Sequence, residues 1–274
     1  MFCEIRELDS SDLTDLLSNL ASDLETHLFV ASRSHEVISR KSSSSILGYF
    51  EDGELVGGVL YGPNLVPFNL TENAATEFGK FLTQLSLRFA SIVGAKSDVE
   101  KLWKNLESAL PKPRLIRETQ KLFVLDEVLP QHHDSKVRLA NTSDLDTYTL
   151  ASIEMFTGEV GLAPNDLVEY RQRVRSQITS NSSYGWFAPD GRVLFKVDVG
   201  SKYNDACQLQ GVWLHPDLRG KGYSAELLHM AINQIQNLHS KKITLYVNDF
   251  NLAGVSLYKR LGFVERNEFQ TIFF

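Results

Sequence analysis

The sequence has few cysteines and no long apolar run. Cys3 and Cys207 are its only two cysteines in 274 residues, too few for a disulfide framework or a cysteine-based metal site. No run approaches the roughly 20 apolar residues that cross a membrane. The opening residues, MFCEIRELDSSDL, are charged where a secretory signal would be apolar. We therefore expect a soluble, cytoplasmic protein with neither a membrane segment nor a metal site.

An excess of basic residues is also absent. The chain has 28 Lys and Arg against 34 Asp and Glu, a formal net charge of −6. Nucleic-acid binding usually needs a basic face, so we expect no nucleic-acid partner. Hydrophobic residues make up 43% of the chain and charged residues 23%, which is typical of folded globular proteins. The length allows two domains, each with its own core.

A polar stretch, PQHHDSK at residues 130–136, separates two blocks of similar size. The strand-like segment KLFVL precedes it. The residues after it have the pattern of a strand followed by a helix, and Thr142, Ser143 or Asp144 could cap that helix. Its adjacent histidines have no accompanying ligand set, so we interpret the stretch as a solvated linker. The predicted domains are residues 1–130 and 131–274.

The order of elements is similar in the two blocks. Each contains an Asp-Gly pair between strand-like runs, Asp52-Gly53 and Asp190-Gly191, and this is the strongest short-range hairpin signal. Later in each block, at residues 89–106 and 241–263, the sequence has the pattern of a strand, a loop and a helix. We predict two related α+β halves, although no sequence repeat is evident. Two unrelated domains that share hairpins are the alternative.

A sharp turn from strand into helix lies in the second half, at VWLHPDLRGKGYSAELL, residues 212–228. Gly211, inside the preceding strand, suggests a bulge or a close approach by a ligand. The following helix has one apolar stripe at helical spacing, made of Leu227, Leu228, Ala231, Ile232, Ile235 and Leu238.

The turn itself has the features of an anion site. Backbone N–H groups at the start of a helix, together with the helix dipole, favour a pyrophosphate; the residues concerned are Arg219, Gly220, Lys221, Gly222, Tyr223 and Ser224. Neither the Walker pattern nor the three-glycine dinucleotide pattern fits. The pattern that remains is Arg-x-x-Gly-x-Gly/Ala, and Ser224 stands where Gly or Ala is usual.

With the later segment TLYVNDFNLAGVSLYKRLGF, residues 244–263, this turn resembles the GNAT superfamily of N-acyltransferases. A group of actinobacterial proteins has a GNAT domain that follows a domain of unknown function. Three further segments of this chain resemble these proteins, namely MFTGEVGLAP, FKVDVG and LQGVWLHPDLRGKG. The resemblance implies two tandem GNAT-like domains, each a mostly antiparallel sheet flanked by helices, and acetyl-coenzyme A as cosubstrate. PNLVPFNLTENAA in the first half lacks the turn, so we expect that half to be degenerate and to bind no coenzyme in the usual way.

The resemblance also implies roles for single residues. Backbone N–H groups of Val212, Trp213 and Leu214 would bind the pantetheine arm and the developing oxyanion. Tyr258 would protonate the leaving thiolate, and Asn251 would hold the coenzyme from the side. Each of these two side chains has another interpretation, Tyr258 as a core tyrosine and Asn251 as a helix cap.

A base is also needed, because a primary amine with a pKa near 10.4 is only about 0.04% neutral at pH 7. We favour Glu159, in the expected loop FTGEVGLAP, over Asp198, because a charged strand residue usually faces water. A water chain is the third candidate. The predicted function is acetyl transfer to the amine of a small-molecule or peptide acceptor. The alternative is a catalytically idle acyl-coenzyme A-binding module that regulates a partner, and in a third hypothesis the first half recognises the acceptor.

Overall fold

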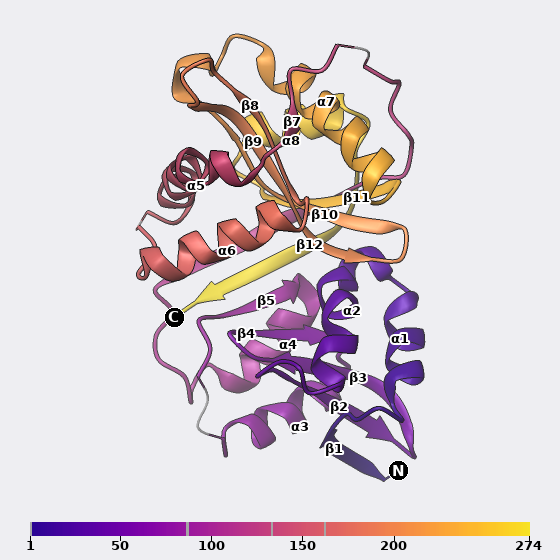
Figure 1. Cartoon of the computed structure of the whole chain (residues 1–274). Helices are drawn as coiled ribbons and strands as arrows, with labels where there is room; N and C mark the ends of the chain where they lie inside the picture. The colour runs from indigo at the N-terminus through magenta and orange to yellow at the C-terminus, as the bar shows by residue number, and fades with distance from the viewer. Residues whose placement is uncertain (1, 86–87, 133, 162) are drawn as a thin grey trace. The chain divides into compact units, whose positions relative to one another are not determined.

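The computed structural model describes residues 2–85, 88–132, 134–161 and 163–274, which divide into two compact units (Figure 1). Unit 1 is Met1–Phe123 with Tyr246–Leu252 and Glu265–Phe274, and unit 2 is Val124–Leu245 with Ala253–Val264. Each unit holds a mostly antiparallel sheet with helices on both faces. The predicted mixed α/β fold class is confirmed.

The sheet of unit 1 has the strand order β1-β2-β3-β4-β5-β12-β6. Its strands are β1 (Cys3–Glu7), β2 (Ser45–Glu51), β3 (Glu54–Tyr61), β4 (Asn64–Phe68), β5 (Ser91–Ala95), β6 (Leu115–Leu125) and β12 (Val264–Phe273). β4 and β5 run parallel. β12, far away in sequence, pairs antiparallel with β5, Phe269 opposite Ala95 and Phe273 opposite Ser91.

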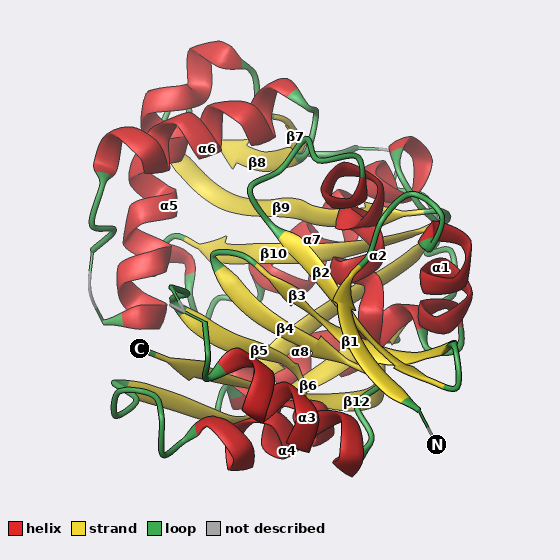
Figure 2. Ribbon diagram, turned by 90° about the horizontal axis from the view of Figure 1, so that it is seen from below, coloured by secondary structure: helices red, strands yellow, loops and turns green. Residues whose placement is uncertain are grey.

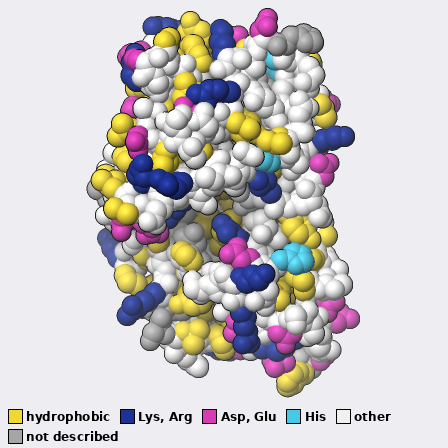
Figure 3. Space-filling view, in the orientation of Figure 1, with side chains coloured by type: hydrophobic (Ala, Val, Ile, Leu, Met, Phe, Trp, Pro, Cys, Tyr) yellow, Lys and Arg dark blue, Asp and Glu magenta, His cyan; other side chains and the backbone are white. Residues whose placement is uncertain are grey.

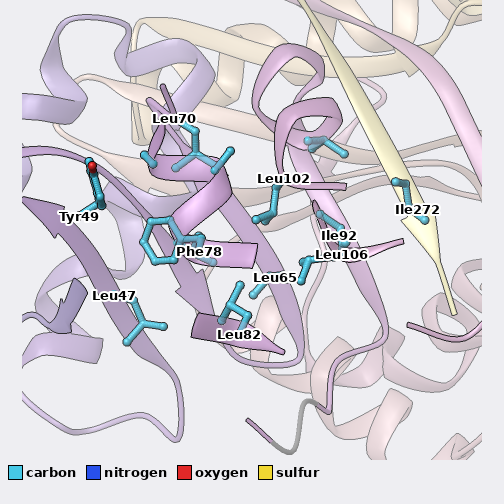
Figure 4. Packing of buried hydrophobic residues seen from close by; sticks show 14 residues of the cluster. Leu47, Tyr49, Leu65, Leu70, Phe78, Leu82, Ile92, Leu102, Leu106 and Ile272 are labelled. Atoms are coloured by element: carbon cyan, nitrogen blue, oxygen red, sulfur yellow. The ribbon is translucent and has the colours of Figure 1, made fainter. Parts of the chain in front are cut away.

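Four helices cover this sheet (Figure 2): α1 (Leu13–Ala21), α2 (Leu24–Ile38), α3 (Glu72–Leu82) and α4 (Lys96–Leu106). α1 and α2 lie on one face, and α3 and α4 on the other. Because side chains alternate along a strand, every second residue of β2, such as Leu47 and Tyr49, reaches the α3–α4 core. There they pack with Phe78 and Leu102 (Figure 4).

The sheet of unit 2 has the order β11-β10-β9-β8-β7. Its strands are β7 (Arg138–Leu139), β8 (Ser183–Phe187), β9 (Val193–Tyr203), β10 (Ala206–Leu214) and β11 (Lys242–Asn248). Its helices are α5 (Leu145–Val160), α6 (Leu167–Thr179), α7 (Tyr223–Leu238) and α8 (Leu252–Arg260). α5 and α6 share a core around Tyr148, Val174 and Trp213, and α7 packs on the opposite face (Figure 1).

The helices and strands follow the same order twice, β-α-α-β-β-β-α-β-α-β, first from β1 to β6 and then from β7 to β12. The predicted repetition is therefore confirmed, as are both hairpins. Glu51 pairs with Glu54 across Asp52-Gly53, where φ is positive at both turn residues. Phe187 pairs with Val193 across the loop that contains Asp190-Gly191.

The expectation that no sequence is repeated is wrong at one place. IRELDSSDL, residues 5–13, and VRLANTSDL, residues 137–145, build the same structure at the start of each repeat. Arg6 binds both carboxylate oxygens of Asp12 at 2.7 and 2.6 Å. Arg138 binds those of Asp144 at 2.7 and 2.9 Å. A bidentate pair of this kind fixes the angle between strand and helix as well as adding energy.

Each of these arginine–aspartate clasps has further contacts in common. The carboxylate also accepts the N–H of the residue three positions before it, Asp9 or Asn141, at 2.9 Å in both cases. Each guanidinium lies over the phenylalanine ring at the end of the second strand of its repeat, 4.2 Å from Phe50 and 3.8 Å from Phe187. The clasp therefore joins the first strand, the first helix and the second strand of each repeat.

The structure tests three local expectations. Asp144, one of the three predicted caps, is the N-cap residue of α5, although its side chain makes no capping hydrogen bond there. The Asn141 side chain caps the 3₁₀ turn Thr142–Asp144 that precedes α5, and accepts the N–H of Ser143 at 2.9 Å. Leu238, the last residue of α7, is 52% exposed, although the other five residues of the stripe are buried. Residues 130–132 and 134–136 are exposed, as expected for a solvated stretch, and they are also hydrogen-bonded to α7, where Asn233 accepts the His132 N–H at 2.9 Å. His133 lies outside the described residues.

Across the described ranges, no helix combines the length and apolar character needed to cross a bilayer. On the face drawn in Figure 3, lysines and arginines lie interspersed with acidic side chains.

The clasp of the second repeat should stabilise the fold. Asp144→Asn should lower the free energy of unfolding by about 1–3 kcal/mol, because the 8% exposed carboxylate holds Arg138 and a backbone N–H. The hydrogen bond from Arg138 lowers the Asp144 pKa, so this stabilisation exists above pH 4 or so and disappears as the pH falls through the folded-state value. Urea titrations at pH 7 and pH 3 measure both effects.

Asp146→Asn is the matched control, since Asp146 is 80% exposed in its ion pair with Arg171. It should change the free energy of unfolding by less than about 0.5 kcal/mol. Equal effects of the two substitutions would contradict the assigned role of the clasp.

Candidate active site

The turn between β10 and α7 presents backbone donors to open space. Gly220 and Gly222 have φ of +72° and +85°, a region that strongly favours glycine. Gly222 is the N-cap of α7 and no side chain caps the helix. A Cβ at either glycine would meet no protein atom within 4 Å. The N–H groups at the start of this 16-residue helix therefore have no capping side chain from the N-cap residue, and a helix start of this kind favours an anion.

The side chains of the turn hold it in place. Arg219 donates from Nε to the carbonyl oxygen of Leu214 at 3.0 Å, which ties the turn to the end of β10. Arg219 and Lys221 are exposed, whereas Tyr223 and Ser224 are half-buried. The Tyr223 ring lies 6.0 Å from that of Trp186 on β8. Two cations therefore lie beside the open N–H groups without covering them.

β10 carries the predicted bulge. Gln210 pairs with Asp198, but Trp213 pairs with Lys196, so β10 has one extra residue in this interval. Gly211, within the bulge, has φ of +62°. The parallel pairing of β10 with β11 covers Ala206–Gln208 among the described residues. Beyond it, the peptide groups of Val212, Trp213 and Leu214 lie where an extended ligand can add as a strand.

A buried ion pair lies directly under the bulge. The Lys196 side chain is fully buried and Asp198 is 5% exposed, and Lys196 Nζ lies 2.6 Å from Asp198 Oδ2. The same Nζ donates to the Gly211 carbonyl oxygen at 3.1 Å. A Cβ on Gly211 would come within 2.9 Å of Nζ and 3.0 Å of Oδ2. The close approach and the positive φ therefore both favour glycine at this position.

Two hydroxyl groups complete the hydrogen bonding of Asp198. Oδ1 accepts from Tyr148 at 2.8 Å and from Ser183 at 2.7 Å. The expectation that Asp198 faces water is wrong, because the strand buries it with its partners. Burial and the nearby Asp198 charge raise the Tyr148 pKa well above its usual value. Sequence reasoning missed Lys196, Tyr148 and Ser183, although the spacing of Lys196 and Asp198 puts both on one face of a strand.

Glu159 and Tyr258 both lie in unit 2. Glu159 is exposed on the last turn of α5, so the expected loop is helical up to Val160, and Gly161 ends the helix with φ of +80°. Tyr258 is 7% exposed on α8. Burial, and to a lesser degree the Glu159 charge, raise the Tyr258 pKa well above its ordinary value. The Tyr258 hydroxyl therefore stays protonated at neutral pH.

The surroundings of Tyr258 differ in part from expectation. Leu257 and Leu261 are only half-buried, and Tyr258 is the buried side chain of α8. The predicted helix stop is confirmed, because Gly262 has φ of +90° and the N–H of Phe263 donates to the Tyr258 carbonyl at 3.1 Å. Asn251, directly before α8, belongs to the 246–252 segment of unit 1.

Unit 1 has a different turn at the equivalent place, between β4 and α3. The Thr71 hydroxyl caps α3 by accepting the Ala74 N–H at 3.0 Å. The buried Asp98 carboxylate accepts the Leu70 N–H at 3.1 Å. Protein side chains thus occupy the donors at this helix start, and a carboxylate beside them disfavours an anion.

Within the described ranges, the structure has no group of three or more His, Cys, Asp or Glu side chains placed to hold a metal ion.

Comparison with known proteins gives a family for each half. Residues 169–263 match the acetyltransferase (GNAT) family and residues 44–148 a domain of unknown function, DUF4081. An uncharacterised N-acetyltransferase of Porphyra purpurea, ycf52, is 25% identical over 152 residues, which is 53% of this chain and 80% of that protein.

Solved structures show the same tandem fold. A GNAT-family acetyltransferase from Colwellia psychrerythraea has a TM-score of 0.57 at 13% identity, with 99% of each chain covered. A tandem GNAT protein from the clavulanic acid biosynthesis pathway has a TM-score of 0.60 at 11% identity, with 98% of each chain covered.

The buried ion pair predicts a specific pattern of stability. Lys196→Met should lower the free energy of unfolding by about 3–5 kcal/mol, because it leaves Asp198 as a buried charge without its cation. Lys196→Met with Asp198→Asn should recover about half of this loss or more, since the second change removes the charge. Urea denaturation of the three proteins measures the effect. Equal stability of the single and double variants would show that the ammonium does not compensate the carboxylate.

Proposed function

We propose that this chain, whose residues 169–263 match the acetyltransferase (GNAT) family and whose residues 44–148 match a domain of unknown function, transfers an acetyl group from acetyl-coenzyme A to a primary amine. One observation carries the proposal. The uncapped start of α7 and the bulged end of β10 lie in the same unit, joined by the contact of Arg219 with Leu214.

The coenzyme would bind through the backbone. Its pyrophosphate fits the N–H groups at Gly220, Gly222, Tyr223 and Ser224, with Arg219 and Lys221 contributing positive charge. The two amides of the pantetheine arm would pair with β10 beyond Gln208, past the residues that pair with β11.

The reaction then needs a C–N bond made, a C–S bond broken and two proton transfers, one from the amine to the base and one from Tyr258 to the sulfur. The amine nitrogen attacks the thioester carbon, the C–N bond forms, and the carbonyl electron pair moves to oxygen. The N–H of Val212 would stabilise this oxyanion. When the oxyanion collapses the C–S bond breaks, and the sulfur receives a proton from the Tyr258 hydroxyl. The excess proton of the amine passes to the base.

Glu159 suits the role of base better than Asp198. Its exposed position on the last turn of α5 lets it exchange protons with water. Both carboxylate oxygens of Asp198 already accept hydrogen bonds from buried groups, Lys196, Tyr148 and Ser183. A water chain remains the alternative route for the proton.

Thiol release tests the function directly. The full chain with acetyl-coenzyme A and a panel of small amines and peptides should release coenzyme A faster than without acceptor. Tight acetyl-coenzyme A binding with no release for any acceptor would favour the second candidate, an idle coenzyme-binding regulatory module. The Ser224 departure from the usual turn motivates that candidate. Absence of binding would exclude both.

Gly222→Val should abolish binding of acetyl-coenzyme A. A β-branched side chain is strained at φ of +85° and would occupy the space proposed for phosphate oxygens. Gly191→Val is the matched control. Gly191 has φ of +84°, and a Cβ there would also meet no atom within 4 Å, but it lies in the β8–β9 hairpin and not in the turn. Calorimetry should show binding by the control alone. Equal affinities would mean that the turn is only structural.

Tyr258→Phe should lower kcat roughly 10²–10³-fold, the range for losing a general acid, and leave coenzyme affinity unchanged. Tyr170→Phe removes a hydroxyl that donates to the Ser152 carbonyl at 3.0 Å in the same unit, and serves as control. Because burial raises the Tyr258 pKa, the parent should show no loss of activity from this group below about pH 10. A Tyr258→Phe kcat within about threefold of the parent would make Tyr258 a packing residue.

A further inference from the structure

We infer that Lys196 is a positioning residue of the proposed reaction, whose buried ammonium holds the Gly211 carbonyl and thereby aims the N–H of Val212. The inference rests on the proposed function, because that N–H is the donor assigned to the oxyanion. Lys196 itself would touch neither the coenzyme nor the acceptor.

The ammonium is surrounded by protein groups on all sides. Nζ donates to Asp198 Oδ2 at 2.6 Å and to the Gly211 carbonyl at 3.1 Å, and its third direction meets Met155 Sδ at 3.9 Å. The ring centre of Tyr148 is 5.1 Å away. Lys196 is fully buried, so each of its N–H groups has a fixed direction.

The contact with Gly211 matters because of peptide geometry. In a trans peptide the N–H points opposite to the C=O of the preceding residue. A bulged residue leaves the regular ladder of hydrogen bonds, and Gly211 is the residue with the fewest steric limits on rotation. The bond from Lys196 therefore fixes the plane of the peptide that joins Gly211 to Val212, and with it the direction of the Val212 N–H.

Stability alone does not account for the ion pair. Replacing a buried pair by apolar residues of similar size is often neutral or stabilising. An apolar pair would lack the donor that the ammonium supplies to the Gly211 carbonyl. Asp198 has a matching task, since its hydrogen bonds from Tyr148 and Ser183 anchor the carboxylate that neutralises and orients Lys196.

The double variant Lys196→Met with Asp198→Asn tests the inference without leaving a buried charge. Oxyanion donors have to be aligned to within a few tenths of an ångström, so kcat should fall about 10- to 100-fold. The KM for the amine and the dissociation constant of acetyl-coenzyme A should stay within about threefold of the parent. Lys202→Met is the control, because Lys202 is an exposed lysine on the same strand and donates to Ser182 at 3.2 Å. The kcat, KM and dissociation constant of this control should match those of the parent.

A second measurement does not depend on turnover. Amide hydrogen exchange of the Gln210–Leu214 segment, in protein without coenzyme, should become about tenfold faster in the double variant and stay unchanged in the Lys202→Met control. If the parent transfers no acetyl group but this difference appears, the proposed function fails and the anchoring of the bulge stands. Unchanged exchange together with unchanged kcat would overturn the inference.

Gly211→Ala approaches the same contact from the other side and serves if the double variant does not fold. Its Cβ would come within 2.9 Å of Lys196 Nζ, so the ammonium has to leave the carbonyl or the bulge has to shift. The same selective loss of kcat is expected. A Gly211→Ala protein with parental kcat and parental amide exchange would show that the anchor is not needed.

Discussion

The left-handed peptide at Gly211 is the constraint on which unit 2 depends. It accompanies one extra residue in β10, which pairs with β9 on both sides of the bulge, while the described pairing with β11 covers Ala206–Gln208. It also admits the ammonium of Lys196, which any side chain at this position would obstruct. The open end of β10, the buried charges beneath it and the direction in which the chain enters the turn at Arg219 all follow from this single conformation.

Local patterns revealed much of this from the sequence. The glycines of the turn, the hairpins and the bulge each depend on a few adjacent residues, and the structure agrees with all of them. The buried partners of Asp198 come from three separate segments, at Tyr148, Ser183 and Lys196. Only the tertiary fold brings these together, so a rule that puts charged strand residues in water failed. Glu159 was misplaced in a loop because helix ends are weakly encoded.

The two repeats share their framework and differ where the chemistry would lie. Both begin with an arginine–aspartate clasp of nearly identical geometry. In the first, Thr71 and Asp98 satisfy the donors before α3, and in the second, glycines leave those of α7 free of side chains. A family of scaffolds can thus keep its fold while one copy gains or loses a ligand, because cap residues contribute little to the sheet and core.

The pairing of β12 with β5 has a consequence for how the protein is made. β5 has emerged from the ribosome, and can pair with β4, long before Val264–Phe273 is synthesised. Until then one edge of the first sheet has no neighbour, and free strand edges recruit other chains. More than 160 residues separate the two strands in sequence. Pairing them therefore carries a large loop-closure entropy cost, which slows the step. The nascent first unit therefore has a period of vulnerability to aggregation that ends only with the last strand described here.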